Sequence, residues 1–206
     1  MSLTLESIQE LNKEDYKKYL QDVNFTQNTC CQFYLKTSTC QYGPLCYKKH
    51  LAPSLSSTLL VRNMFRDRKP ALINRDLFMK KKVLKGWGDD ESRLPGVEFK
   101  RFFLDIVPEF EKFGRVKKIL VCNNLAHHLK GNVYVLYWNV DDAVSCYNKM
   151  NGRYYGGFPL NIEYSYLVSS NEALCSFGSK CTIKAKCNFL HVFKAPRKRS
   201  RSPLPR

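Results

Sequence analysis

Apolar residues change their spacing several times along the chain, and each change predicts a new element. Between residues 4 and 22 they recur on one side of a polar helix, whereas over residues 57–65 they fit a strand. Over residues 97–113 they return at helical spacing, which predicts an amphipathic helix ending near Gly114. Pro108 should kink this helix or end its first segment.

Two further strands, a second helix and a last strand follow. Residues 116–121 fit the second strand of the domain, and residues 132–138, rich in β-forming side chains, fit the third. Asn139 is placed to cap a helix that ends at Asn151 and Gly152, and residues 158–164 form the last strand. The resulting order, βαββαβ, is that of the split βαβ or ferredoxin-like fold, an α+β architecture.

These elements divide the chain into five pieces. A central domain over residues 56–166 contains a long basic insertion at 66–97. The other pieces are a helical extension (1–29), two cysteine-rich segments (30–52 and 173–193) and a basic Arg/Ser tail (194–206). No apolar run approaches the ~20 residues that cross a bilayer, and the first residues do not form a signal peptide. We therefore expect a reducing compartment, the cytosol or nucleus, and no membrane partner.

The charge of the chain favours a polyanionic partner. Its 34 Lys and Arg against 18 Asp and Glu give a net charge of +16. The first 29 residues are net acidic, whereas residues 61–93 and the tail hold much of the excess. The sequence contains neither a basic amphipathic helix nor a lipidation motif, so nucleic acid is the expected partner rather than an anionic membrane.

Both cysteine-rich segments end in Cys-x3-His. Three thiolates and one imidazole complete the tetrahedral shell of a structural zinc ion, whose binding folds a segment too short for its own core. We therefore expect two structural zinc ions. The ligands are Cys31, Cys40, Cys46 and His50 in the first finger, and Cys175, Cys181, Cys187 and His191 in the second.

The remaining cysteines and histidines fit other roles. Cys30 could replace Cys31, but it lengthens the first interval, so Cys31 is preferred. Cys122 and Cys146 fall within the predicted central fold, where they fit small core residues. His127 and His128 fit a loop. A zinc enzyme such as a deaminase would need an open metal position and a nearby general base. The sequence offers neither, so we expect no enzyme and no small-molecule substrate.

Small CCCH fingers usually bind single-stranded RNA, with aromatic rings stacked on bases and basic residues on phosphates. Both segments contain that mixture. The candidate RNA-binding residues are Phe33, Tyr34, Lys36, Tyr47, Lys48 and Lys49 in the first finger, and Phe177, Lys184, Lys186 and Phe189 in the second.

The central domain has a weaker RNA signature. An RNA-binding RRM carries stacking aromatics on its third strand, in the motif K/R-G-F/Y-G/A-F-V-x-F/Y. The corresponding residues here are KGNVYVLY at 130–137, in which Tyr134 keeps one stacking position and Asn132 replaces the other aromatic. An RRM-like sheet weakened in this way favours a protein-binding role.

The fingers flanking an RRM-like domain, with the strings HLKGNVYVLY, NGRYYGG and CNFLHVF, resemble the small subunit of the U2 auxiliary factor. The chain is more similar still to the zinc-finger, RNA-binding-motif and serine/arginine-rich branch of that family. The resemblance covers roughly residues 30–196. It implies that the central domain is a U2AF-homology motif, which binds a Trp-containing peptide of a large-subunit-type splicing factor or an snRNP protein. It also implies that the fingers recognise the AG of the pre-mRNA 3′ splice site.

The resemblance also assigns peptide-binding residues. Arg153, Tyr154 and Tyr155 match the family's Arg-x-Phe loop, with Tyr155 in the Phe position. Asp105 and Glu109 lie on the helix that faces the basic part of the peptide in the family. The expected function is that of a nuclear splicing factor that promotes spliceosome assembly on major or minor introns. The alternative is a general CCCH/RRM protein in mRNA turnover or export.

Overall fold

The computed structural model of the 206-residue chain describes residues 29–66, 95–167 and 170–196. The helix predicted within 4–22, most of the 66–97 insertion and most of the basic tail lie outside the described residues. Within the described residues, no helix is both long and apolar enough to cross a membrane.

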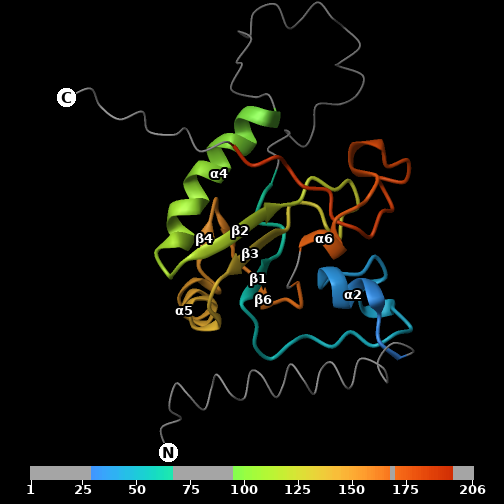
Figure 1. The fold of residues 1–206 in the computed structure, drawn as a ribbon, viewed down its shortest axis with the longest axis horizontal. Helices are drawn as coiled ribbons and strands as arrows, with labels where there is room; N and C mark the ends of the chain where they lie inside the picture. The colour runs from blue at the N-terminus through green and yellow to red at the C-terminus, as the bar shows by residue number, and fades with distance from the viewer. Residues whose placement is uncertain (1–28, 67–94, 168–169, 197–206) are drawn as a thin grey trace, which may run out of the picture.

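A four-stranded antiparallel sheet forms the centre of the molecule. Its spatial order is β2 (Val116–Val121), β3 (Val133–Tyr137), β1 (Thr58–Val61) and β6 (Ile162–Tyr164). Helices α4 (Pro95–Glu111) and α5 (Val140–Met150) cover one face, as Figure 1 shows. This arrangement confirms the predicted ferredoxin-like, α+β fold.

Alternation along the strands separates two cores. Val133, Val135 and Tyr137 point to the helices, whereas Tyr134 and Leu136 point to the opposite face. That opposite face carries the two cysteine-rich segments. They contain α2 (Gln32–Thr37) and the 3-10 turn η1 (Gly43–Leu45) in one, and α6 (Ser170–Ala173) and the turn η4 (Gly178–Lys180) in the other.

The first and last strands are shorter than predicted. Strand β1 ends at Val61 because Asn63 adopts a left-handed conformation (φ 48°) and the chain turns away from the ladder. The predicted strand at 158–164 is two strands. The first, β5 (Phe158–Pro159), pairs with β4 (Tyr154–Tyr155) across a glycine turn, and only β6 joins β1.

The two helix-end predictions also need correction. Of the two outcomes expected at Pro108, a kink or a helix end, the end is excluded, because α4 continues to Glu111 with Ile106 and Phe110 buried on either side of the proline. Asn139 occupies the N-cap position of α5, but its side chain makes no capping hydrogen bond. Its amide instead donates to Asp142, whose carboxylate also accepts the backbone N–H of Arg115 at 3.2 Å.

Candidate functional site

The eight predicted ligands form two compact clusters. In each cluster the three sulfur atoms and one imidazole nitrogen all lie within 4.8 Å of one another. Cys30 is buried but lies outside both clusters, which agrees with the preference for Cys31. All nine cysteines of the chain are among the described residues, and none forms a disulfide.

The same glycine turn shapes both fingers. Gly43 lies three residues after Cys40, and Gly178 three residues after Cys175; both have φ near 47°, the region that favours glycine. In each case the glycine N–H bonds to the preceding cysteine carbonyl at 3.0 Å, and its own carbonyl accepts from the next cysteine. The short opening interval of the second finger therefore takes the conformation of the middle interval of the first.

The donor atoms fit a structural metal ion. The Nε2 atoms of His50 and His191 are buried among the thiols without a hydrogen-bond partner in the structure. Burial lowers the pKa of both imidazoles, which keeps them in the neutral form that binds metal. Burial raises the pKa of Cys40 and Cys187 to about 11, so metal binding would release protons from these thiols. Either cluster could hold a metal ion, and the ligand set is that of structural zinc.

The first finger is bonded to the sheet face opposite the helices. Tyr134 is fully buried, at 0% exposure, and its hydroxyl donates to the carbonyl of Thr37 at the end of α2. Arg62, which directly follows β1, forms a two-pronged ion pair with Glu163 and donates to the Ser38 carbonyl at 3.2 Å. The expectation that Tyr134 keeps a base-stacking position is therefore wrong, because the finger covers the ring.

The second finger packs beside the first on the same face. Leu167, Ala173 and Leu190 join the sheet residues of this face in one buried cluster, whose sheet members are Leu60, Leu120, Cys122, Tyr134 and Leu136. Asn124 holds the finger from the loop after β2: its amide donates to the Phe189 carbonyl and its oxygen accepts from the His191 N–H, both at 2.9 Å.

A strap from the second finger crosses to the helix side. Residues 191–193 run along the end of β2, where Cys122 and Val192 form an antiparallel bridge. Phe193 then stacks on Phe99 of α4 with ring centroids 4.4 Å apart and meets Phe65 edge-on at 5.2 Å. This contact was not predicted. The sequence signal for it is an aromatic residue two positions after His191, the last predicted ligand.

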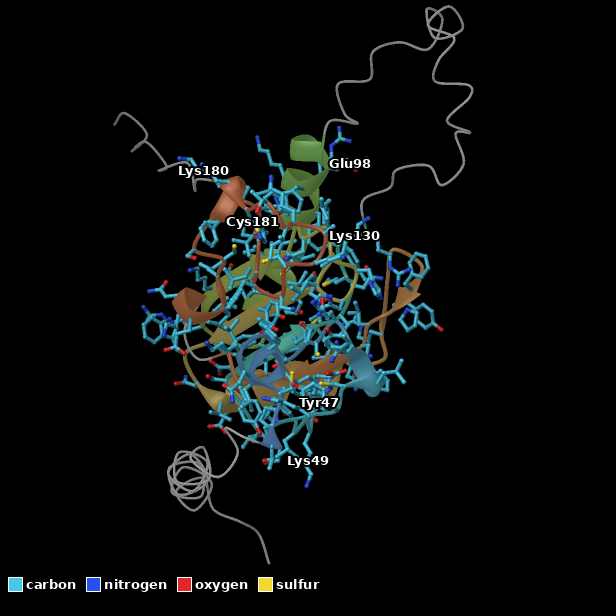
Figure 2. The ribbon with its side chains drawn as sticks, turned by 90° about the vertical axis from the view of Figure 1, so that its right-hand side faces the viewer. Tyr47, Lys49, Glu98, Lys130, Lys180 and Cys181 are labelled. Atoms are coloured by element: carbon cyan, nitrogen blue, oxygen red, sulfur yellow. The ribbon has the colours of Figure 1, made fainter. Side chains whose placement is uncertain are left out.

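The predicted RNA-binding aromatics fall into two groups. Phe33 and Phe189 meet edge-to-face with centroids 6.0 Å apart, which joins the two fingers, and Tyr34 stacks on His50 at 4.4 Å. Tyr47 and Phe177, by contrast, are 88% and 71% exposed. Figure 2 shows Tyr47 and Lys49 toward one end of the finger-bearing face and Lys180 toward the other.

Two of the predicted lysines lie close to these rings. Lys36 lies 6.0 Å from the Phe189 ring, so it approaches the junction of the two fingers. Lys48 lies 5.9 Å from the Tyr47 ring. The exposed lysines of the predicted set are Lys36, Lys49, Lys184 and Lys186. Both fingers thus expose rings and cations, the components of single-strand recognition.

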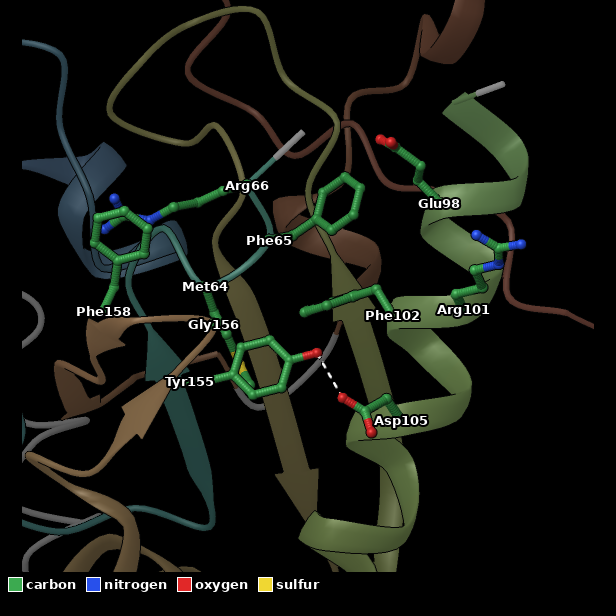
Figure 3. A pocket seen from close by; sticks show the side chains of 10 residues that line it. All are labelled: Met64, Phe65, Arg66, Glu98, Arg101, Phe102, Asp105, Tyr155, Gly156 and Phe158. Atoms are coloured by element: carbon green, nitrogen blue, oxygen red, sulfur yellow. Dashed lines mark hydrogen bonds between the residues drawn. The ribbon is translucent and has the colours of Figure 1, made fainter. Parts of the chain in front are cut away.

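A pocket of about 540 Å³ opens on the helix side, between α4 and the β4–β5 hairpin. Tyr155 forms one wall, and its hydroxyl donates to Asp105 at 2.7 Å, as Figure 3 shows. The Arg66 guanidinium lies 3.6 Å from the centre of the Phe158 ring. The lining residues are Met64, Phe65, Arg66, Glu98, Arg101, Phe102, Asp105, Tyr155, Gly156 and Phe158.

The structure brings together only two of the five predicted peptide-binding residues. Asp105 and Tyr155 line the pocket, whereas Tyr154 and Arg153 are exposed on the hairpin outside it. Glu109 also lies outside and pairs with Lys112 at 2.5 Å. Sequence reasoning missed the pocket's Arg66 and Phe158, since their contact joins two segments that are far apart in the sequence.

Comparisons with known proteins agree with this architecture. A family model described as RNA recognition motif matches residues 104–161. The chain is 35% identical, over 168 residues or 81% of its length, to the U2 small nuclear ribonucleoprotein auxiliary factor 35 kDa subunit-related protein 2 of Mus musculus. It is 32% identical over 166 residues, 79% of this chain, to the splicing factor U2af 38 kDa subunit of Drosophila melanogaster. It is also 34% identical over 172 residues, 81% of this chain, to the zinc finger CCCH domain-containing protein 5 of Arabidopsis thaliana.

These matches define the class as an RRM domain flanked by two CCCH-type clusters. The chain belongs to the family of the U2 auxiliary factor small subunit and its related proteins. It spans 36%, 60% and 21% of the lengths of the mouse, fly and plant proteins, respectively. The family's named splicing factors are not enzymes.

Proposed function

We propose that this chain is a nuclear pre-mRNA splicing factor that binds RNA with its two zinc fingers and a protein partner with its helix-side pocket. The observation that carries the proposal is the burial of the sheet face, with Tyr134 at 0% exposure beneath the first finger. An RRM normally presents this face to RNA. Here the face is used to hold the fingers, so RNA contacts are assigned to the outer surface of the fingers themselves.

The RNA ligand is the AG of a 3′ splice site. Tyr47 and Phe177 each offer an exposed ring on which a base can stack, and the contact between Phe33 and Phe189 holds the two fingers as one unit. The names of the related auxiliary-factor proteins support a role in splicing.

The protein ligand is a short peptide with a large aromatic side chain, such as the Trp of a large-subunit-type splicing factor. The pocket volume of about 540 Å³ accommodates an indole, and Phe102 and Tyr155 supply aromatic walls. Its charge is mixed, because Glu98, Arg101 and Asp105 line it from α4 and Arg66 lines it from the other side, as Figure 3 shows. A peptide carrying both signs of charge therefore fits this pocket better than a purely basic one.

The RNA half of the proposal is tested with short single-stranded RNAs ending in UAG or UAC. The zinc-loaded protein should prefer UAG, and a chelator should remove that preference. Cys46→Ala should lose one of the two zinc ions and the AG preference, whereas the matched control Cys30→Ala, next to a ligand but outside the cluster, should keep both. An AG preference retained in Cys46→Ala would overturn the role of the first finger.

The partner half is tested by titrating a fluorescent Trp-containing peptide. Tyr155→Ala removes a wall of the pocket and should weaken binding about 30-fold, the effect of losing a hot-spot residue. Arg153→Ala should weaken it less, because Arg153 lies outside the pocket lining. Lys149→Ala, an exposed change on α5, serves as the control. Unchanged affinity in Tyr155→Ala would refute the pocket assignment.

A further inference from the structure

One exposed tryptophan lies at an end of the sheet that neither the fingers nor the peptide pocket uses. Trp138 directly follows β3, and its backbone N–H donates to the carbonyl of Arg115, the residue before β2, at 3.1 Å. This bond places Arg115 and Trp138 side by side. Figure 1 shows this end of the sheet beside α5, away from α2 of the first finger.

Two cations lie against the indole. The Arg115 guanidinium is 5.1 Å and the Lys117 ammonium 5.3 Å from the ring centroid. Both basic residues are exposed, and Trp138 itself is 54% exposed. Asp142 accepts the backbone N–H of Arg115, and Asp141 is exposed on the first turn of α5.

The ring continues the face that carries the fingers. The backbone hydrogen bond places Arg115 opposite Trp138, and Lys117 lies at the irregularity in the β2–β3 pairing, between Val116 and Lys118. Trp138 is likewise two residues beyond Leu136, which is buried in the cluster beneath the fingers. The sheet face is therefore covered at one end and open, with one indole and two cations, at the other.

We infer that Trp138, with Arg115 and Lys117, is a second contact for single-stranded RNA, in which a base stacks on the indole and the two cations bind the flanking phosphates. The combination of one exposed ring and adjacent basic side chains is that of sequence-tolerant single-strand binding. The inference rests on the proposed RNA-binding role of the fingers and extends the path of the strand beyond them.

A polyanion suits this site better than a protein surface. The chain has a net charge of +16, and the site adds two cations to an exposed ring rather than an apolar cluster. Lysines on an edge strand also discourage sheet-to-sheet pairing, but that role does not call for an exposed indole beside them.

Intrinsic fluorescence tests the site directly, since the chain contains two tryptophans, Trp87 and Trp138. In a Trp87→Phe variant, Trp138 is the remaining tryptophan. Oligouridine, which lacks AG, should quench its emission as the RNA binds. Binding without any quenching would overturn the inference. Quenching by an acidic peptide but not by RNA would overturn it as well and would indicate a protein partner.

Affinity measurements separate this site from the fingers. Trp138→Ala should lower the affinity for a long RNA about 5- to 150-fold, the contribution of one stacked base, while Trp138→Phe retains most of it. The UAG-to-UAC ratio should not change. Lys117→Ala should lower the slope of log affinity against log salt by about 0.7, whereas the charge-matched control Lys149→Ala should not.

The outcomes distinguish the two proposals. Loss of AG preference in the fingers with quenching retained would leave Trp138 as a nonspecific RNA site. AG preference with neither quenching nor an affinity loss in Trp138→Ala would remove the second contact and leave the fingers intact. A thermal melt of each variant checks that the substitution at this exposed position leaves the fold unchanged.

Discussion

The clearest perturbation of the finger–sheet contact is at Tyr134, which lies at a position where an RRM ordinarily displays a ring for RNA. Tyr134→Phe removes only the hydroxyl that donates to the Thr37 carbonyl, and it leaves the ring in its buried cluster. Burial raises the pKa of Tyr134 well above its ordinary value, so the hydroxyl stays protonated and remains a donor at neutral pH.

The magnitude follows from this burial. A buried acceptor left without its partner costs about 1–3 kcal/mol of unfolding free energy. For a domain of this size, each kcal/mol lowers Tm by about 2–4 °C. Tyr134→Ala also empties the space of the ring, and it should cost about 3–5 kcal/mol.

Urea and thermal unfolding, followed by circular dichroism, measure these costs, and atomic absorption measures zinc. We expect both variants to keep their metal ligands and two zinc ions, because Tyr134 belongs to neither cluster. The control is Tyr154→Phe, which removes a hydroxyl from an exposed ring and should change stability by less than about 0.5 kcal/mol.

The opposite pattern would refute the reasoning. If Tyr134→Ala changed stability by less than about 0.5 kcal/mol but abolished RNA binding, Tyr134 would be an exposed stacking ring. The fingers would then not cover the sheet, and the RNA assignment would return to the central domain.

Three further predictions concern other contacts. Gly131→Ala should destabilise the domain by at least about 2 kcal/mol, because Gly131 has φ +70° and an added Cβ would overlap the Phe65 carbonyl oxygen; an unchanged urea midpoint would contradict this close approach. Phe193→Ala should lower the free energy of unfolding by at least about 1 kcal/mol, because it removes the stacking on Phe99. It should also weaken Trp-peptide binding, because Phe193 contacts Phe65, which lines the pocket. Phe177→Ala, at an exposed ring, is the control, and equal melting temperatures of the two variants would contradict a stabilising role for residues 191–193. Burial and the neighbouring His127 lower the pKa of His128 from 6.5, so the unfolded chain binds this proton more readily and the free energy of unfolding falls as pH drops below about 6.5. His128→Gln should lose less unfolding free energy between pH 7 and pH 5 than the natural chain. Parallel plots of unfolding free energy against pH for the two proteins would exclude the effect.

Local spacing accounts for the features that the sequence predicts well. The intervals between cysteines and histidines fix which side chains can surround one ion, because each ligand set lies within a short segment. Periodicity likewise located the four strands of the sheet and both large helices, because each repeat reports which side of an element is buried. The element ends were less predictable: Pro108 lies inside α4, and Asn139 does not cap α5 through its side chain.

What covers each buried face depended on the tertiary structure. Alternation indicates that Tyr134 and Leu136 share a face. The same alternation is compatible with an RNA strand, a protein partner or another part of the chain covering that face. Only the folded chain shows that finger residues distant in sequence take that position, and that Phe33 meets Phe189 from the far end of the chain. The sequence by itself determined the two Cys3His clusters and the order of elements, since these depend on short-range spacing. The tertiary structure decided which aromatic rings remain free for a ligand, because burial results from contacts between distant segments.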